Sequence, residues 1–172
     1  MGSQTLLISP NNMPQILIVC TANICRSPVG EALLRDHLQK QNLGAEWTVR
    51  SAGTWAQVKR GPSRYSIQVA ADRGLDITNH QAEMIEAHHM KNADLVLCME
   101  SGHAEALRAE FPLYAHKIFL MTEMVGKQYS ISDPYGQPLE SYQMMADELE
   151  GLIDAGLGRI IELAGANGAK RP

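Results

Sequence analysis

Short, continuously apolar runs alternate with amphipathic segments along most of the chain. The runs are rich in Val, Ile and Leu, and their apolar residues are consecutive rather than alternating. This pattern is typical of strands that are buried on both faces of a parallel sheet. It predicts strands at residues 15–19, 47–49, 94–99 and 117–121, the second being the weakest.

Helical periodicity fills the segments between these runs. Ser27-Pro28 is predicted to open the first helix, because Ser is a frequent N-cap and Pro fits the first turn. Gly156 and Gly158 are expected to bend or interrupt the last helix. The other predicted helices cover residues 63–73, 83–91, 104–111 and 138–163, and a long loop spans residues 122–137.

Strands that alternate with helices imply βαβ units, and therefore an α/β fold with three layers, α/β/α, around a four-stranded parallel sheet. A chain of 172 residues is long enough for one domain, which we assign to residues 14–165. Residues 1–13 are expected to be an irregular leader or an added expression remnant. Ligands of such sheets bind beyond the carboxyl ends of the strands, so the loops that follow the strands hold the candidate site.

Composition narrows the class of ligand and the compartment. The formal net charge of −4 gives the protein no broad attraction for nucleic acid or an anionic membrane, so an anion needs a local site. No apolar run approaches the roughly 18 residues of a membrane span, and residues 5–8 are too short for a signal-peptide core. An odd count of three cysteines argues against a disulfide framework, and we expect a cytoplasmic protein.

Cys20 and Arg26 enclose a five-residue loop between the first strand and the first helix. The backbone N–H groups of such a loop can converge on one anion, and the helix N-terminus adds partial positive charge. Arg26 can grip two phosphate oxygens in a fork that Lys cannot form. The predicted phosphate-binding loop comprises Thr21, Ala22, Asn23, Ile24, Cys25 and, at its end, Ser27.

The same electrostatic field predicts a chemical role for Cys20. A helix N-terminus with a nearby cation stabilises a thiolate, which could attack a phosphorus atom held in the loop, while Ser27 donates a hydrogen bond to the sulfur. Asp133, in the long loop expected at the same edge, could protonate the leaving oxygen and then activate water. A buried structural cysteine and a simple Asp-Pro turn are the alternatives that these residues alone leave open.

Several separate motifs resemble one known family. V-C-T-A-N-I-C-R-S-P, S-A-G-T, N-H, D-L-V-L-C-M and D-P-Y-G resemble the low-molecular-weight protein tyrosine phosphatases, in order, from about Gln15 to Leu163. The resemblance implies the phosphotyrosine protein phosphatase I-like fold, no metal or cofactor, and hydrolysis through a cysteinyl phosphate. It places Cys20, Arg26 and Asp133 on the family's nucleophile, phosphate-binding arginine and general acid, and Asn23, Ser27, Ser51 and His80 on the polar network around the loop.

Some positions depart from the family's pattern. Ala22 stands where many members have Gly, which is harmless only if its φ is negative. Arg50 and Glu83 stand where Asp and Arg are frequent, and we hypothesise that they form a swapped ion pair. Trp55 and Tyr135 are the candidate aromatic walls of the pocket, although a core or surface role for Trp55 stays open.

Three other functions agree with parts of the sequence. Related enzymes hydrolyse phosphoarginine, but these tend to have Thr where this chain has Ile24, and a bulky apolar residue favours a flat aromatic leaving group. Thiol-linked arsenate reductases need two further cysteines on a mobile segment, whereas Cys98 lies in a predicted buried strand. A non-catalytic phosphate-binding or redox-sensing module is the third. The resemblance implies a reversible Cys20–Cys25 disulfide, which we expect to regulate the enzyme.

The expected partners follow from the predicted chemistry. They are a phosphotyrosine-containing protein as substrate, inorganic phosphate as product and a cognate tyrosine kinase. No second Cys/His pair at ligand spacing accompanies Cys20 and Cys25, so no metal site is predicted. The sequence leaves open the physiological substrate and the oligomeric state.

Overall fold

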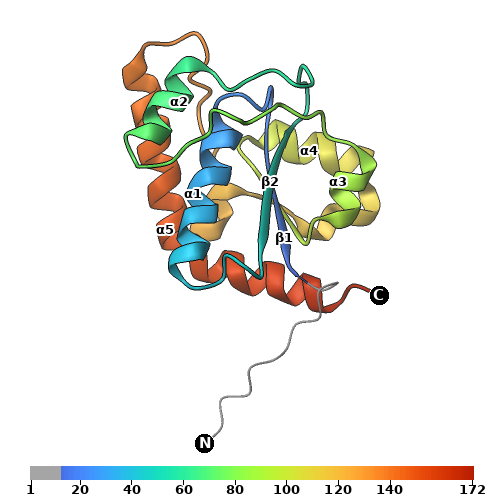
Figure 1. The fold of residues 1–172 in the computed structure, drawn as a ribbon. Helices are drawn as coiled ribbons and strands as arrows, with labels where there is room; N and C mark the ends of the chain where they lie inside the picture. Colours follow the sequence, from blue (N-terminus) through green and yellow to red (C-terminus); the bar gives the residue numbers. More distant parts are fainter. Residues whose placement is uncertain (1–12) are drawn as a thin grey trace, which may run out of the picture.

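A sheet of four parallel strands lies between two layers of helices in the computed structural model, which describes residues 13–172 (Figure 1). The sheet has the order β2-β1-β3-β4. Its strands are β1 (Gln15–Cys20), β2 (Thr48–Gly53), β3 (Leu95–Cys98) and β4 (Ile118–Leu120). The predicted α/β/α class with a four-stranded parallel sheet is confirmed.

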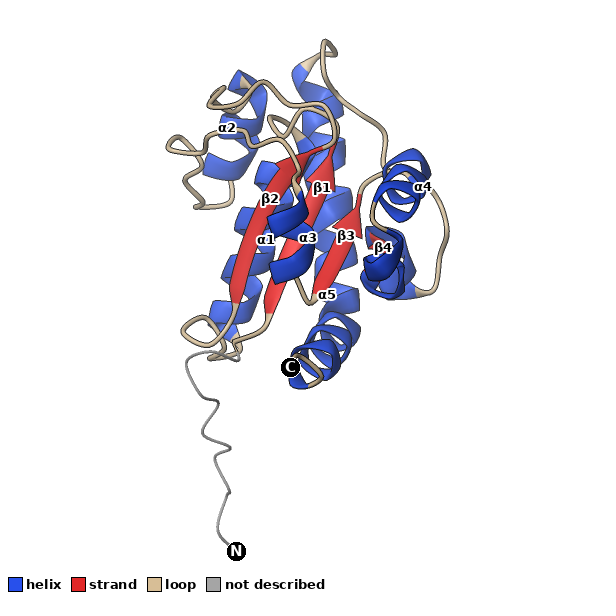
Figure 2. Ribbon diagram, turned by 90° about the vertical axis from the view of Figure 1, so that its right-hand side faces the viewer, coloured by secondary structure: helices blue, strands red, loops and turns tan. Residues whose placement is uncertain are grey.

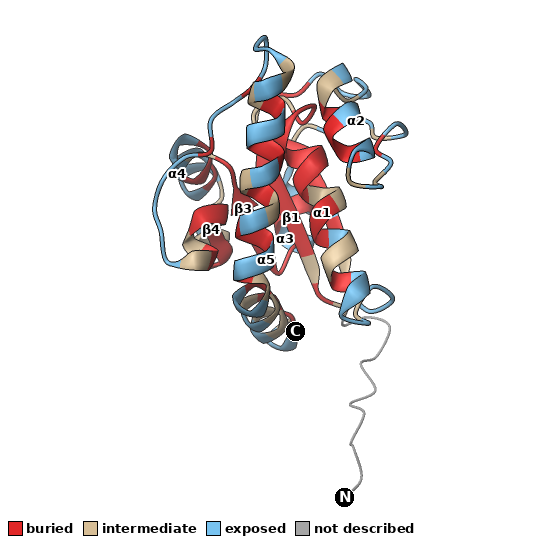
Figure 3. Ribbon diagram, turned by 90° about the vertical axis from the view of Figure 1, so that its left-hand side faces the viewer, coloured by how far each residue is buried: buried red, intermediate tan, exposed pale blue. Residues whose placement is uncertain are grey.

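The two central strands are buried on both faces, as their unbroken apolar runs predict. Ile16 and Leu95 face a core formed with α1 (Arg26–Lys40), α2 (Arg64–Ala71) and α5 (Leu139–Ala169). Leu17 and Val96 face the opposite core, formed with α3 (Ala87–Asn92) and α4 (Ser101–Glu110). Figure 2 shows the four strands side by side behind α3, and Figure 3 shows the opposite face of the sheet, which α1, α2 and α5 cover.

The first helix starts one residue before the predicted Ser27, at Arg26, with Cys25 at the N-cap position. Cys25 provides no side-chain cap, and Ser27 does not cap the helix either. The Ser27 hydroxyl instead accepts a hydrogen bond from Asn23 Nδ2 at 2.8 Å. The prediction of Ser27 as N-cap is therefore wrong, because the loop before the helix uses that hydroxyl.

The predicted helix over residues 83–91 is also wrong in its first half. Helix α3 begins only at Ala87, and the preceding segment is extended. Met84 forms a parallel bridge with Gly53, and the Gly53 N–H donates to the Glu83 carbonyl at 2.8 Å. The backbone hydrogen bonds of this segment go to the end of β2 rather than to a helical turn.

Helix α5 runs for 31 residues without a break, so the interruption expected at Gly156 and Gly158 is wrong. A Cβ at Gly156 would lie 2.8 Å from Met124 Cβ, so the glycine lets α5 approach the short 3₁₀ helix Met121–Val125. The other 3₁₀ helix is Pro112–Lys117. None of the helices in residues 13–172 is both long and apolar enough to cross a membrane.

The carboxyl edge of the sheet gathers segments that are far apart in sequence. Thr54, after β2, donates its N–H to the Cys20 carbonyl at 3.0 Å. Arg26, at the start of α1, contacts Glu100, which follows β3, and the carbonyl of Ile131, in the long loop after β4. The candidate site therefore lies where the parallel topology predicts it.

Candidate active site

Asn23 fixes the shape of the loop between β1 and α1. It is fully buried and has a φ of +56°, a left-handed conformation that costs a non-glycine residue about 1–2 kcal/mol. Its Nδ2 donates to Ser27 Oγ at 2.8 Å and to Ser51 Oγ at 2.9 Å, and its Oδ1 accepts the Glu83 N–H at 2.9 Å. His80 Nε2 lies 2.7 Å from the Asn23 carbonyl oxygen. These contacts from three other segments hold the loop in one conformation.

The structure tests three expectations about the loop and the residues around it. Burial lowers the pKa of His80, so its neutral ring donates from Nε2 to the Asn23 carbonyl. Ala22 is not among the described non-glycine residues with positive φ, so its replacement of Gly causes no strain. The hypothesised Arg50–Glu83 ion pair is wrong. Glu83 Oε2 pairs with His89 Nε2 at 2.8 Å, because His89 is fixed by the Glu86 N–H on its other ring nitrogen.

Gly53, at the end of β2, lets the loop lie against the sheet. A Cβ at this position would clash with the Thr21 carbonyl oxygen, so only glycine fits. The Trp55 N–H donates to the same carbonyl at 2.9 Å. Sequence reasoning missed this role, although a glycine that ends a buried strand is a signal for close backbone approach.

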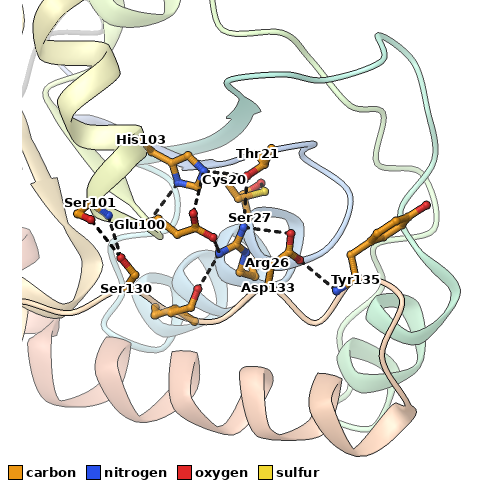
Figure 4. Close-up of polar contacts among 11 residues, drawn as sticks. Cys20, Thr21, Arg26, Ser27, Glu100, Ser101, His103, Ser130, Asp133 and Tyr135 are labelled. Atoms are coloured by element: carbon orange, nitrogen blue, oxygen red, sulfur yellow. Dashed lines mark hydrogen bonds and ion pairs between the residues drawn. The ribbon is translucent and has the colours of Figure 1, made fainter.

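The Cys20 sulfur lies 2.9 Å from Ser27 Oγ. Ser27 Oγ already accepts a hydrogen bond from Asn23 Nδ2, so its own hydrogen is free to point at the sulfur. The chain Asn23–Ser27–Cys20 thus directs one hydrogen bond onto the atom predicted to be the nucleophile. Figure 4 shows Cys20 and Ser27 side by side.

The two other cysteines lie in different surroundings. Burial raises the pKa of Cys25, whose sulfur contacts Ser63 Oγ at 3.4 Å and Tyr142 Oη at 3.6 Å. Burial raises the pKa of Cys98 to about 12. Both are therefore thiols at neutral pH, and all three cysteines are free. Residues 13–172 contain no group of three or more His, Cys, Asp or Glu side chains that could hold a metal ion.

Arg26 is almost completely buried, with 1% of its surface exposed. Its Nη1 donates to Glu100 Oε1 at 2.5 Å and to the Ile131 carbonyl at 2.6 Å (Figure 4). Its Nη2 lies 3.4 Å from Asp133 Oδ2, and its buried Nε has no hydrogen-bond partner among the described residues. The protein thus holds Nη1 firmly, whereas Nη2 has only the longer contacts to Asp133 and to Thr21 Oγ1 at 3.5 Å. An oxyanion that replaces these longer contacts can bind Nε and Nη2 together, as a bidentate ligand.

Glu100 and His103 connect the first turn of α4 to the loop. The Glu100 N–H donates to His103 Nδ1 at 3.2 Å, so the ring hydrogen is on Nε2 and points to Thr21 Oγ1, 2.9 Å away. Burial lowers the pKa of His103, which keeps it neutral. Sequence reasoning missed both residues. A Glu directly after Met99, at the carboxyl end of a buried strand, was the available signal.

A cavity of about 440 Å³ opens above the loop. Asp133 lies on its wall, where its Oδ1 accepts the Tyr135 N–H at 3.1 Å. Ile24 is buried beneath it, whereas Trp55 and Tyr135 are 80% and 55% exposed at its rim. The residues lining this cavity are Cys20, Thr21, Ala22, Ile24, Cys25, Arg26, Trp55, Ala56, Gln57, Arg60, Asp133 and Tyr135. One cavity thus brings together the predicted catalytic and wall residues and four of the six predicted loop residues. Asn23 and Ser27 are fully buried and do not line it, and Ser51 and His80 lie behind the loop.

Comparison with known proteins assigns the family. Residues 15–162 match the model of the low molecular weight phosphotyrosine protein phosphatases. A protein-arginine-phosphatase of Geobacillus stearothermophilus is 38% identical over 141 residues, covering 81% of this chain and 91% of that protein. The low molecular weight protein-tyrosine-phosphatase Etp of Escherichia coli K12 is 36% identical over 135 residues, covering 78% of this chain and 86% of that protein.

A solved structure shows the same fold. The crystal structure of a low molecular weight protein tyrosine phosphatase from T. tengcongensis superposes with a TM-score of 0.81 at 37% identity, covering 85% of this chain and 99% of that one. The range of the family model includes every residue of the site described above. The chain therefore belongs to the low molecular weight phosphotyrosine protein phosphatase family and is a phosphatase of that family.

Proposed function

We propose that the protein hydrolyses phosphotyrosine in proteins through a cysteinyl-phosphate intermediate. One observation carries the proposal: Cys20, with the Ser27 hydroxyl 2.9 Å from its sulfur, shares one cavity with the buried Arg26 and with Asp133. A nucleophile, an anion clamp and a proton donor are the groups that phosphoryl transfer to a cysteine requires.

In the first step the Cys20 thiolate attacks phosphorus in line with the leaving phenolic oxygen. The loop N–H groups and the Nε/Nη2 edge of Arg26 bind the phosphoryl oxygens as charge spreads over them. Asp133 gives its proton to the phenolic oxygen as the P–O bond breaks. The products are tyrosine, a phosphorus–sulfur bond at Cys20 and an Asp133 carboxylate.

In the second step Asp133 acts as a base. Its carboxylate takes a proton from water, and the oxygen of that water attacks the cysteinyl phosphate. The P–S bond breaks, and the sulfur leaves as a thiolate that the Ser27 hydroxyl stabilises. Release of inorganic phosphate restores both groups, because the proton given in the first step is recovered in the second.

Pocket shape supports tyrosine as the leaving group. Ile24, Trp55 and Tyr135 line the cavity, and aromatic side chains at a rim stack on a flat ring. Protein arginine phosphatase is the second candidate, favoured by the 38% identical relative of that name. For either, the partners are phosphoproteins, and for the first a tyrosine kinase would supply them.

Phosphate release from matched phosphotyrosine and phosphoarginine peptides, with chelator present, tests the proposal. We expect the wild type to prefer phosphotyrosine, Cys20→Ser to be inactive on both, and Ile24→Thr to shift the preference toward phosphoarginine. Preference of the wild type for phosphoarginine would replace the first candidate by the second. Full activity of Cys20→Ser would refute the mechanism for both.

A further inference from the structure

The basic rim comprises Lys59, Arg60 and Arg64, which follow Trp55 along the chain, and of these Arg60 lines the cavity. The chain carries a net charge of −4, yet residues 54–71 contain no Asp or Glu. All three side chains are exposed, and none has an ion-pair partner within the part of the chain that the structure describes. Their positive charge is therefore not neutralised by the protein itself.

Arg60 lies at the cavity. It is one of the lining residues, its Nη2 is 3.3 Å from Tyr135 Oη, and its guanidinium carbon lies 5.8 Å from the centre of the Tyr135 ring. An arginine over an aromatic face keeps its charge while its orientation becomes restricted. The cation is thus held next to the proposed aromatic wall, within reach of a peptide whose phosphorylated side chain enters the cavity.

The turn that carries Lys59 has a strained backbone and is held by backbone hydrogen bonds. The Arg60 N–H closes it onto the Gln57 carbonyl at 3.1 Å, and Lys59 has a φ of +71°, where glycine is the unstrained choice. Ala82 bonds to both sides of it, accepting from the Lys59 N–H and donating to the Arg60 carbonyl, each at 2.8 Å.

Acidic groups that face the rim are few. Asp133 is the one acidic residue among the described residues that line the cavity, and its carboxylate already lies beside Arg26. Next to Arg60 the surface exposes apolar side chains, with Val58 62% and Trp55 80% exposed. A positive rim with apolar side chains fits a peptide that combines acidic residues with the phosphorylated one.

We propose that the basic rim selects phosphoproteins with Asp or Glu on either side of the phosphotyrosine, which it binds as ion pairs. This inference rests on the proposed function and names the class of its substrate. Each exposed ion pair of this kind changes kcat/KM by about two- to fivefold. The effect falls as salt rises, because the charges on both partners are solvent-exposed.

The test uses two phosphotyrosine peptides that differ only in flanking residues, Asp/Glu in one and Asn/Gln in the other. The readout is the ratio of their kcat/KM values for the wild type, for Arg60→Gln and for the triple variant with Lys59, Arg60 and Arg64 changed to Gln. Arg159→Gln, an exposed arginine on α5 remote in sequence from the rim, is the matched control.

We expect the wild type and Arg159→Gln to favour the acidic peptide about tenfold at low salt, mostly through KM. The ratio should fall stepwise in Arg60→Gln and in the triple variant, and also at high salt. Equal rates of the wild type on both peptides would overturn the inference while leaving the proposed function intact. Hydrolysis of phosphoarginine but of neither phosphotyrosine peptide would instead show that the proposed function itself has failed.

Discussion

The base and the mouth of the cavity are built in opposite ways. At the base, Asn23, Arg26 and Ser27 are buried, and their side chains are tied to β2, α4 and the extended segment before α3. At the mouth, Trp55 and Tyr135 are largely exposed, and the polar contact from the Tyr135 hydroxyl is the one with Arg60. A change at the base should therefore damage chemistry and stability together, whereas a change at the mouth should alter substrate choice at little cost in stability.

The largest effect is expected from Arg26→Lys. Lysine retains a positive charge but cannot contact Glu100 and the Ile131 carbonyl while offering two parallel donors to a phosphate. We expect kcat/KM to fall about 10²- to 10³-fold, measured with phosphotyrosine peptide. Arg35→Lys, on the same helix, should stay within about twofold. If Arg26→Lys stayed nearly fully active, the two parallel donors of the Arg26 guanidinium would not be needed for phosphate binding.

Asn23 allows backbone strain to be separated from hydrogen bonding. Asn23→Ala loses the bonds to Ser27, Ser51 and the Glu83 N–H and also puts Ala at a φ of +56°, so unfolding should become easier by about 2–4 kcal/mol. Asn23→Gly loses the same bonds without the strain and should recover roughly 1 kcal/mol. Urea unfolding measures both variants. If they prove equally stable, the left-handed backbone is not a cost here.

At the mouth, Trp55→Ala and Tyr135→Ala should mainly weaken substrate binding. An aromatic contact contributes about 0.5–1.5 kcal/mol, so KM for a phosphotyrosine peptide should rise roughly two- to tenfold in each variant. Because both side chains are exposed, stability should change by less than about 0.5 kcal/mol. Leu113→Ala, which is also exposed, at 83%, and lies outside this cavity, is the control. Unchanged KM values would exclude these residues as pocket walls.

The smallest expected effect concerns pH. Burial lowers the pKa of His103 below its usual 6.5, so between the two values the unfolded chain binds more protons than the folded one. The stability linked to neutral His103 is thus complete above about pH 6.5 and is lost as pH falls toward the folded pKa. The groups that face the ring are Glu100, Arg26 and Asp133.

The variant His103→Gln tests whether stability falls with falling pH because His103 becomes protonated. Glutamine offers an acceptor and a donor like the neutral ring but does not titrate. The wild type should therefore lose more stability than the variant between pH 7 and pH 5 in urea unfolding. Parallel pH profiles for the two proteins would contradict the assignment of a neutral His103.

The sequence alone was sufficient for the sheet, because buried parallel strands leave continuous apolar runs such as Ile16–Val19 and Leu95–Cys98. It failed where local propensity competed with long-range hydrogen bonds. Residues 83–86 have helical propensity but bond to Gly53 and Asn23, and Gly156 reads as a helix breaker but packs against Met124.

For the site, sequence reasoning located the residues that lie close together along one loop, such as Cys20 and Arg26. It missed Glu100 and His103, because nothing in a periodicity shows which residue after β3 turns toward the loop. It also proposed the wrong partner for Glu83, since the fixed orientation of His89 depends on a capping box that only the folded helix forms.

Trapping the intermediate on Asp133→Ala tests the central claim most directly. p-Nitrophenyl phosphate has a leaving group that needs no proton, so this variant should form the cysteinyl phosphate but hydrolyse it slowly, because the base of the second step is missing. We predict a burst of one equivalent of nitrophenol and a protein mass increased by one phosphoryl group, both absent when Cys20→Ala is added. A burst that persists in the double variant, or a phosphoryl group on a residue other than Cys20, would contradict the account.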